Sequence, residues 1–310
     1  KQGGTADTVY SSLIQAQVCM GDFFRPEKAP GRITRRKKMN VKISYNTLVY
    51  AGENIADGIR RLAKFGYDGV DFVGEPDQFD TAEICRLLKE NNIEASSICA
   101  IFTNERDFVS DDPVIRKQAV EYMKKCVDFS VAIGAKSIST QVTANMKIDA
   151  DAPFETAWKW AVEGLKEAGE YALKNNIRLT LEAWNRYETY LITKLDMALK
   201  MVNEVGLENV GVMGDTFHMN IEESNMGDAI RNVGKKLYYL HIADSNRAAP
   251  GRGHIDFEEI AQALKDIDYN GWISMELLPA AANPFSGIVQ EEFYDQYTEE
   301  SITYLKKLFS

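Results

Sequence analysis

From Val41 onward, the chain alternates short apolar, β-branched runs with longer stretches in which apolar residues recur at helical spacing. The longer stretches at 54–65, 113–133 and 153–175 place apolar side chains three or four positions apart, which is typical of amphipathic helices. The short runs predict eight strands, at 41–45, 69–73, 94–98, 136–140, 178–182, 210–214, 237–242 and 272–277. Eight strand–helix units over about 270 residues predict an α/β protein with a single (β/α)8 TIM barrel.

The main alternative is an open, doubly wound sheet, which usually carries a glycine-rich phosphate loop after its first strand. Here the first strand leads into SYNTLVYAGEN (44–54), which has no such loop. No linker divides residues 39–310, so we expect one barrel catalytic domain there.

Residues 1–38 form a basic N-terminal extension, with eight Lys/Arg and three Asp/Glu and therefore a net charge of +5. The whole chain carries a net charge of −10, so the remainder is acidic. The extension also contains apolar residues that favour burial: Tyr10, Leu13, Ile14, Phe23 and Phe24. The extension is either a flexible, solvated tail or a docking segment, and because of these apolar residues we expect it to dock on the acidic barrel or on another subunit.

Composition restricts the partners and the compartment. The net charge of −10 argues against general nucleic-acid affinity. No apolar run approaches the roughly 20 residues needed to cross a bilayer, so no membrane association is expected. The four cysteines form no CxxC pair, which indicates neither a zinc ribbon nor a disulfide framework. A reducing, cytoplasmic compartment is the expectation.

Chemically active side chains follow the last four predicted strands. Glu182 ends the fifth strand, Asp215 the sixth, His241 lies near the end of the seventh, and Glu276 near the end of the eighth. Active sites of TIM barrels lie at the C-terminal ends of the strands, so these four side chains are expected side by side.

Three carboxylates crowded together repel one another, and a divalent cation removes that repulsion. Oxygen ligands with one imidazole suit Mn²⁺, Mg²⁺ or Co²⁺, and zinc also fits. The alternative is that each residue caps its strand or pairs with a nearby Lys or Arg. His218 follows Asp215 by three residues and is expected to face the same cavity. His254, in GRGHIDF, either orients a loop or is simply exposed.

The chain resembles the xylose-isomerase-like sugar isomerases and epimerases, most closely the ketose 3-epimerases of the tagatose and psicose type, over roughly residues 40–308. The motifs that carry the resemblance are EAWNRYET (182–189), GDTFHMNIEE (214–223), HIADSNRAAPGRGHIDF (241–257) and WISMEL (272–277). The resemblance implies a metal, usually manganese or cobalt, whose ligands match Glu182, Asp215, His241 and Glu276. It also implies that Glu182 and Glu276 are the acid–base catalysts.

The reaction implied by the resemblance begins with removal of a proton next to the carbonyl of a keto-sugar, through a metal-stabilised enediolate. The family's substrate contacts match Glu188, His218 and Arg247. Two loops depart from the family's pattern, SYNTLVYAG (44–52) and STQVTANMKID (139–149), and both are expected to wall the sugar pocket. The sequence therefore leaves the identity of the sugar or glycoside open.

Three other functions stay open at this point. The same enolisation serves a lyase that cleaves 3-keto-glycosides, as in the catalytic subunits of C-glycoside deglycosidases, which work with a small β-rich partner subunit. A nuclease of the endonuclease IV type normally needs more histidines than the three present here. A non-catalytic sugar-binding module would not need an intact set of metal ligands. The resemblance also implies a homo-oligomer.

Overall fold

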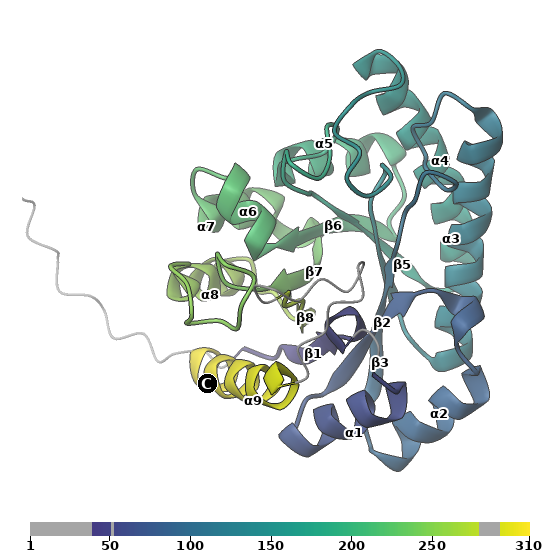
Figure 1. The fold of residues 1–310 in the computed structure, drawn as a ribbon. Coiled ribbons are helices and arrows are strands. Elements are labelled where there is room, and N and C mark those ends of the chain that lie inside the picture. Colours follow the sequence, from purple (N-terminus) through teal and green to yellow (C-terminus); the bar gives the residue numbers. More distant parts are fainter. Residues whose placement is uncertain (1–38, 51–52, 279–291) are drawn as a thin grey trace, which may run out of the picture. The chain divides into compact units, whose positions relative to one another are not determined.

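The computed structural model describes residues 39–50, 53–278 and 292–310. The N-terminal extension and its predicted docking lie outside this described part. Eight parallel strands pair in chain order, and the last strand pairs with the first to close a barrel (Figure 1). The predicted TIM barrel is confirmed.

Each of the eight apolar runs forms a strand, with boundaries shifted by no more than two residues. At the eighth position the strand ends at Met275, so Glu276 directly follows it. The strands are β1 (Lys42–Asn46), β2 (Gly69–Gly74), β3 (Glu94–Ala100), β4 (Ser137–Thr140), β5 (Arg178–Glu182), β6 (Val210–Asp215), β7 (Leu237–Ile242) and β8 (Trp272–Met275).

Helices surround the barrel and connect consecutive strands (Figure 1). Those expected from apolar spacing at 54–65, 113–133 and 153–175 form α1, α3 and α4. No helix in the described ranges is both long and apolar enough to cross a membrane. The helices are α1 (Ile55–Phe65), α2 (Thr81–Glu90), α3 (Pro113–Ile133), α4 (Phe154–Lys174), α5 (Leu195–Val205), α6 (Thr216–Glu222), α7 (Met226–Val233), α8 (Phe257–Asp266) and α9 (Glu292–Leu308).

Helix starts follow local capping chemistry. The Asp256 carboxylate accepts the backbone N–H of Glu259 at 3.1 Å, which begins α8 as the Asp-x-x-Glu spacing indicates. The Asp215 carboxylate likewise accepts the N–H of Phe217 at 2.8 Å, so α6 begins directly where β6 ends. A buried strand therefore passes into a helix with no intervening loop, and His218 is held on the first turn of that helix.

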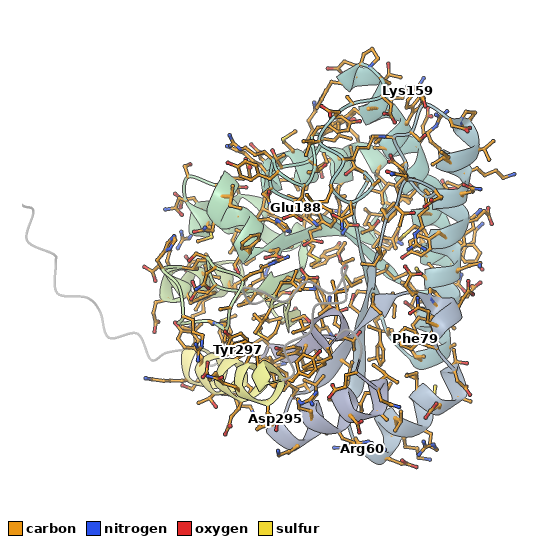
Figure 2. All side chains as sticks on the ribbon, viewed as in Figure 1. Arg60, Phe79, Lys159, Glu188, Asp295 and Tyr297 are labelled. Carbon is orange, nitrogen blue, oxygen red and sulfur yellow. The ribbon has the colours of Figure 1, made fainter. Side chains whose placement is uncertain are left out.

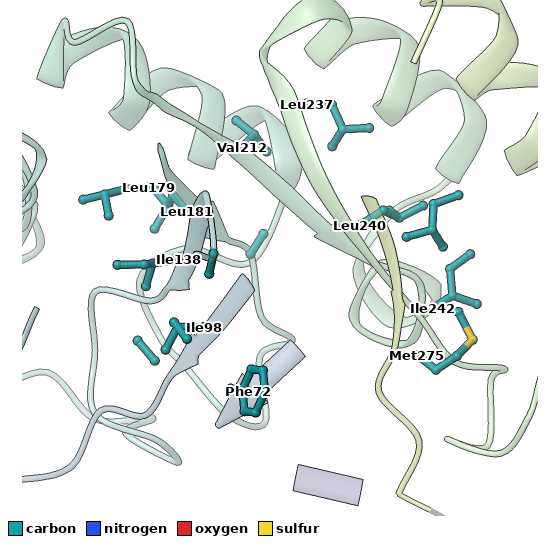
Figure 3. Packing of buried hydrophobic residues seen from close by; sticks show 14 of the residues in the cluster. Phe72, Ile98, Ile138, Leu179, Leu181, Val212, Leu237, Leu240, Ile242 and Met275 are labelled. Carbon is teal, nitrogen blue, oxygen red and sulfur yellow. The ribbon is translucent and has the colours of Figure 1, made fainter. Parts of the chain in front are cut away.

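Apolar strand residues pack in a continuous buried cluster that includes Leu181, Val212 and Ile242 (Figure 3). The lumen of the barrel is different because it contains hydroxyl groups. The Tyr239 hydroxyl lies 3.1 Å from Ser44 Oγ and 3.0 Å from Ser96 Oγ. These residues belong to β7, β1 and β3, which are not neighbours in the sheet, so the hydrogen bonds cross the barrel interior.

Candidate active site

Four buried side chains meet at the C-terminal end of the barrel. Glu182, Asp215, His241 and Glu276 each offer a ligand atom, and these atoms all lie within 4.8 Å of one another. They come from β5, β6, β7 and the residue after β8, which are adjacent in the sheet. The structure therefore brings together the four residues that the strand-end argument selected.

Two buried polar atoms in this cluster make no hydrogen bond to a described residue. They are Glu182 Oε1 and His241 Nδ1. His241 Nδ1 lies 3.9 Å from Glu182 Oε1 and 3.5 Å from Glu276 Oε2, beyond normal hydrogen-bond range. Buried polar atoms are almost always paired, and three carboxylates with one imidazole form a donor set suited to a divalent cation. The residues present therefore fit a divalent metal ion.

Arg247 supplies positive charge to the same cluster. Its guanidinium donates to Asp215 Oδ2 at 2.5 Å and to Glu276 Oε2 at 2.9 Å, and it lies 4.4 Å from the ring centre of Phe217. The sequence suggested Arg247 as a sugar contact. In this structure its side chain lines the cavity, while these hydrogen bonds go to two carboxylates of the cluster.

The pKa values of the two glutamates in the cluster are shifted in opposite directions. Burial, reinforced by the charge of Glu276, raises the pKa of Glu182. Burial also acts to raise the pKa of Glu276, but the neighbouring His241 and Arg247 charges outweigh it and hold that pKa below its usual range. Such a separation of two carboxyl groups is characteristic of acid–base pairs.

Glu276 is held by further residues that the sequence analysis did not identify. Its Oε1 accepts a hydrogen bond from Asn46 Nδ2 at 3.2 Å, and Cys99 Sγ lies 3.7 Å from the same oxygen. Asn46 is the last residue of β1, so the strand-end argument, extended to the first strand, would have found it. Cys99 lies within the apolar end of β3, where no sequence signal marked it.

His218 is buried beside the four-residue cluster. Its Nδ1 accepts the backbone N–H of Asn185 at 3.2 Å, and its Nε2 lies 3.8 Å from Asp215 Oδ2. Its ring stacks on Trp184 with centroids 5.8 Å apart. Burial lowers the pKa of His218, so the imidazole is neutral near pH 7, and the Asn185 contact leaves the proton on Nε2.

A cavity lies beside the cluster and is lined in part by Glu182 and Glu276. Glu188, which is labelled in Figure 2, follows β5 in the chain, lines the cavity and accepts a hydrogen bond from Asn185 Nδ2 at 2.7 Å. The lining residues are Leu48, Cys99, Ile101, Phe102, Gln141, Asn145, Glu182, Trp184, Glu188, His218, Arg247, Glu276 and Leu278.

The loop that carries Arg247 is organised around the buried carboxylate of Asp244. This carboxylate accepts the backbone N–H groups of Ser245 at 2.7 Å, Gly251 at 2.8 Å and Ile255 at 3.2 Å. His254 Nδ1 lies 2.9 Å from Ser245 Oγ, so this exposed histidine does contact the loop. The GRGH segment therefore contributes to the placement of Arg247.

Paired carboxylates, an imidazole and an arginine beside a cavity at the C-terminal end of a barrel are groups that enzymes use for acid–base chemistry. Residues 59–308 match the family described as the xylose isomerase-like TIM barrel. The chain belongs to this family.

Several members of this family that are similar to the chain are named as epimerases. A D-psicose 3-epimerase of Ruminiclostridium cellulolyticum is 34% identical over 223 residues, which cover 70% of this chain and 76% of the relative. An L-ribulose 3-epimerase of a Methylomonas species is 32% identical over 237 residues, which cover 74% of this chain and 82% of the relative. The crystal structure of a Methylomonas D-allulose 3-epimerase in complex with D-allulose superposes with a TM-score of 0.80, at 28% identity, covering 87% of this chain and 99% of that one. This chain is accordingly an enzyme of the isomerase and epimerase type.

Proposed function

We propose that this protein is a divalent-metal-dependent ketose 3-epimerase that acts on an unphosphorylated keto-sugar. The observation that carries the proposal is the convergence of Glu182, Asp215, His241 and Glu276 beside a cavity that two of them line. The names of the relatives agree with the reaction, since they are epimerases of ketoses at carbon 3.

Glu182 and Glu276 form the acid–base pair in this proposal. Both carboxyl groups line the cavity, and Glu182 Oε1 makes no hydrogen bond within the described part of the chain. One carboxylate removes the proton from the carbon next to the carbonyl, and the other returns a proton to the opposite face of that carbon. The stereocentre inverts as a result, and the two glutamates exchange roles in the reverse reaction.

The proposed metal ligands are the same Glu182 and Glu276 together with Asp215 and His241. When bound, a divalent ion supplies Lewis-acid stabilisation of the negative charge that develops on the sugar oxygens. We propose Mn²⁺ as this ion, with Co²⁺ and Mg²⁺ as alternatives, because the donor set combines hard oxygens with one imidazole.

The remaining cavity residues orient the sugar. Neutral His218 presents Nε2–H as a donor, and Glu188 presents a carboxylate oxygen as an acceptor, so together they suit a sugar hydroxyl. Arg247 lines the cavity and is proposed to bind a sugar oxygen further along. A homo-oligomer and a cytoplasmic location stay predictions.

The test is a panel of free ketoses and 3-keto-glycosides, incubated with the protein and Mn²⁺ in D₂O. The proposal expects conversion of a free ketose into its carbon-3 epimer, with one deuterium atom incorporated at carbon 3. Chelation of the metal should stop both conversion and exchange, and added Mn²⁺ should restore them. Absence of deuterium incorporation with every ketose in the panel would contradict the proposal.

The same panel tests the lyase alternative. A lyase releases the aglycone from a 3-keto-glycoside and leaves free ketoses unchanged. The relatives named above are epimerases and give this alternative less support. Its small β-rich partner subunit would be sought by co-purification.

A further inference from the structure

One hydrogen bond of the active-site region spans the barrel lumen. His241 Nε2, on β7, lies 2.9 Å from Asp71 Oδ2, on β2, and both side chains are fully buried. In the sheet, β8 and β1 separate these two strands. The contact is therefore a side-chain bridge across the interior, which neither strand pairing nor helix capping requires.

This hydrogen bond decides which nitrogen of His241 faces the cluster. A carboxylate only accepts hydrogen bonds, so Nε2 carries the proton and donates it to Asp71. Nδ1 is thereby the nitrogen directed at Glu182 and Glu276, at 3.9 Å and 3.5 Å. The ring of Tyr239 packs edge-on against His241 at 5.7 Å and further restricts rotation of the imidazole.

Asp71 has few other interactions that would compensate for its burial. Its second oxygen, Oδ1, is buried and makes no hydrogen bond to the described residues. Its one ion pair within those residues is the contact with His241. A buried carboxylate with an unpaired oxygen lowers stability, so packing alone gives no reason for an acid at this position.

We propose that Asp71 is a positioning residue for the metal site. In the ion-bound state it would hold His241 as the neutral Nε2–H tautomer, with Nδ1 free to serve as a ligand, and thereby set the affinity for the ion. Carboxylate–imidazole–metal arrangements fix ring orientation and raise the basicity of the ligand, and loss of the outer partner typically weakens binding 10–100-fold. The inference rests on the metal site of the proposed function and names a residue that acts through His241 without touching the substrate.

The experiment measures the Mn²⁺ dissociation constant by competition with a fluorescent chelator. Asp71→Asn keeps the shape and one acceptor oxygen but removes the charge, so it should weaken binding about tenfold. Asp71→Ala removes the acceptor and should weaken binding about 100-fold. At saturating Mn²⁺, Asp71→Asn should retain a kcat within about threefold of the wild type, since Asp71 does not contact the substrate.

Asp68→Asn is the matched control, because it makes the same change three residues earlier, immediately before β2 begins. Asp68 is exposed and accepts the backbone N–H of Ile43 at 2.9 Å, away from the cluster. This variant should bind Mn²⁺ like the wild type. Thermal unfolding of the metal-free proteins checks that each variant is folded, and the isosteric Asn variant keeps the test decisive if the Ala variant does not fold.

A second readout is independent of activity. Nitrogen-15 NMR of histidine side chains in the Zn²⁺-loaded protein reports the tautomer directly. The wild type should show His241 protonated on Nε2, and Asp71→Ala should lose this single, well-defined state. Unchanged Mn²⁺ affinity in both Asp71 variants, with an unchanged tautomer, overturns the inference and leaves the proposed function standing. If the wild type itself binds no divalent ion, the inference and the proposed function both fall.

Discussion

A single methyl group at Gly253 should disable the loop that carries Arg247. A Cβ atom built at this position would lie 2.2 Å from Asp244 Oδ1 and 2.4 Å from Ser245 Oγ, much closer than real contacts allow. The backbone of Gly253 is not in the left-handed region, so alanine is excluded by this contact alone. The Asp244 carboxylate must move, and it is the acceptor that organises the loop.

The free-energy cost of Gly253→Ala is estimated from the hydrogen bonds that the displaced carboxylate would lose. Asp244 Oδ1 accepts two backbone N–H groups, from Ser245 and Ile255. Each hydrogen bond to a charged group contributes about 1.5–3 kcal/mol, so complete loss would cost about 3–6 kcal/mol locally. Relaxation of the loop would recover part of this free energy. A residual cost of about 2 kcal/mol corresponds to a roughly 30-fold decrease in the population of the loop conformation that places Arg247 over the cluster.

The assay is kcat/KM for the ketose identified by the panel, together with thermal unfolding. Gly253→Ala should reduce kcat/KM by about 30-fold or more, because Arg247 no longer lies over Asp215 and Glu276. The midpoint of unfolding should fall by only a few degrees, since the loop is a small part of the fold. Gly58→Ala, in α1, adds the same methyl group where it meets Tyr50 at 3.2 Å, and it should leave kcat/KM unchanged. A kcat/KM of Gly253→Ala within twofold of the wild-type value would show that the Asp244 hydrogen bonds do not hold Arg247 in place.

Three further predictions concern the site itself. Glu276→Gln should reduce kcat about 1000-fold, while calorimetry still detects weakened Mn²⁺ binding. Turnover close to that of the wild type would contradict the acid–base role of Glu276. Arg247→Ala should mainly raise the apparent KM, and a fall in kcat alone would contradict a sugar contact. Burial and Glu276 raise the pKa of Glu182, so the metal-free fold loses stability as pH rises from about 4.5 through the folded pKa. Binding of Mn²⁺ requires the deprotonated carboxylate, so the rise in unfolding temperature caused by Mn²⁺ should be larger at pH 8 than at pH 5.5. An equal rise at the two pH values would contradict the role of Glu182 as a ligand.

The fold was predictable from sequence because both periodicities are strong. Barrel strands are buried on both faces, so they form short β-branched runs, and the helices between them present one apolar side. The four cluster residues were predictable from a topological rule alone: parallel strands end at the same rim, so Glu182 and Asp215 must approach each other. Their roles as metal ligands and catalysts stay predictions.

Other features of the site depend on geometry that the sequence does not carry. Asp71 lies in the middle of an apolar strand, and only the closed barrel shows that it reaches His241 across the lumen. An acid inside such a run was a signal, but it named no partner. Arg247 has a left-handed backbone, with φ of 61°, inside a loop held by Asp244. Its contacts with Asp215 and Glu276 follow from that loop conformation, which no strand-end argument could predict.

Anomalous X-ray diffraction at the manganese edge, on crystals of the protein grown with Mn²⁺, tests the proposed metal site most directly. A strong peak is expected within coordination distance of Glu182, Asp215, His241 Nδ1 and Glu276. Absence of a peak between these four side chains in Mn²⁺-saturated crystals would contradict the proposed metal site.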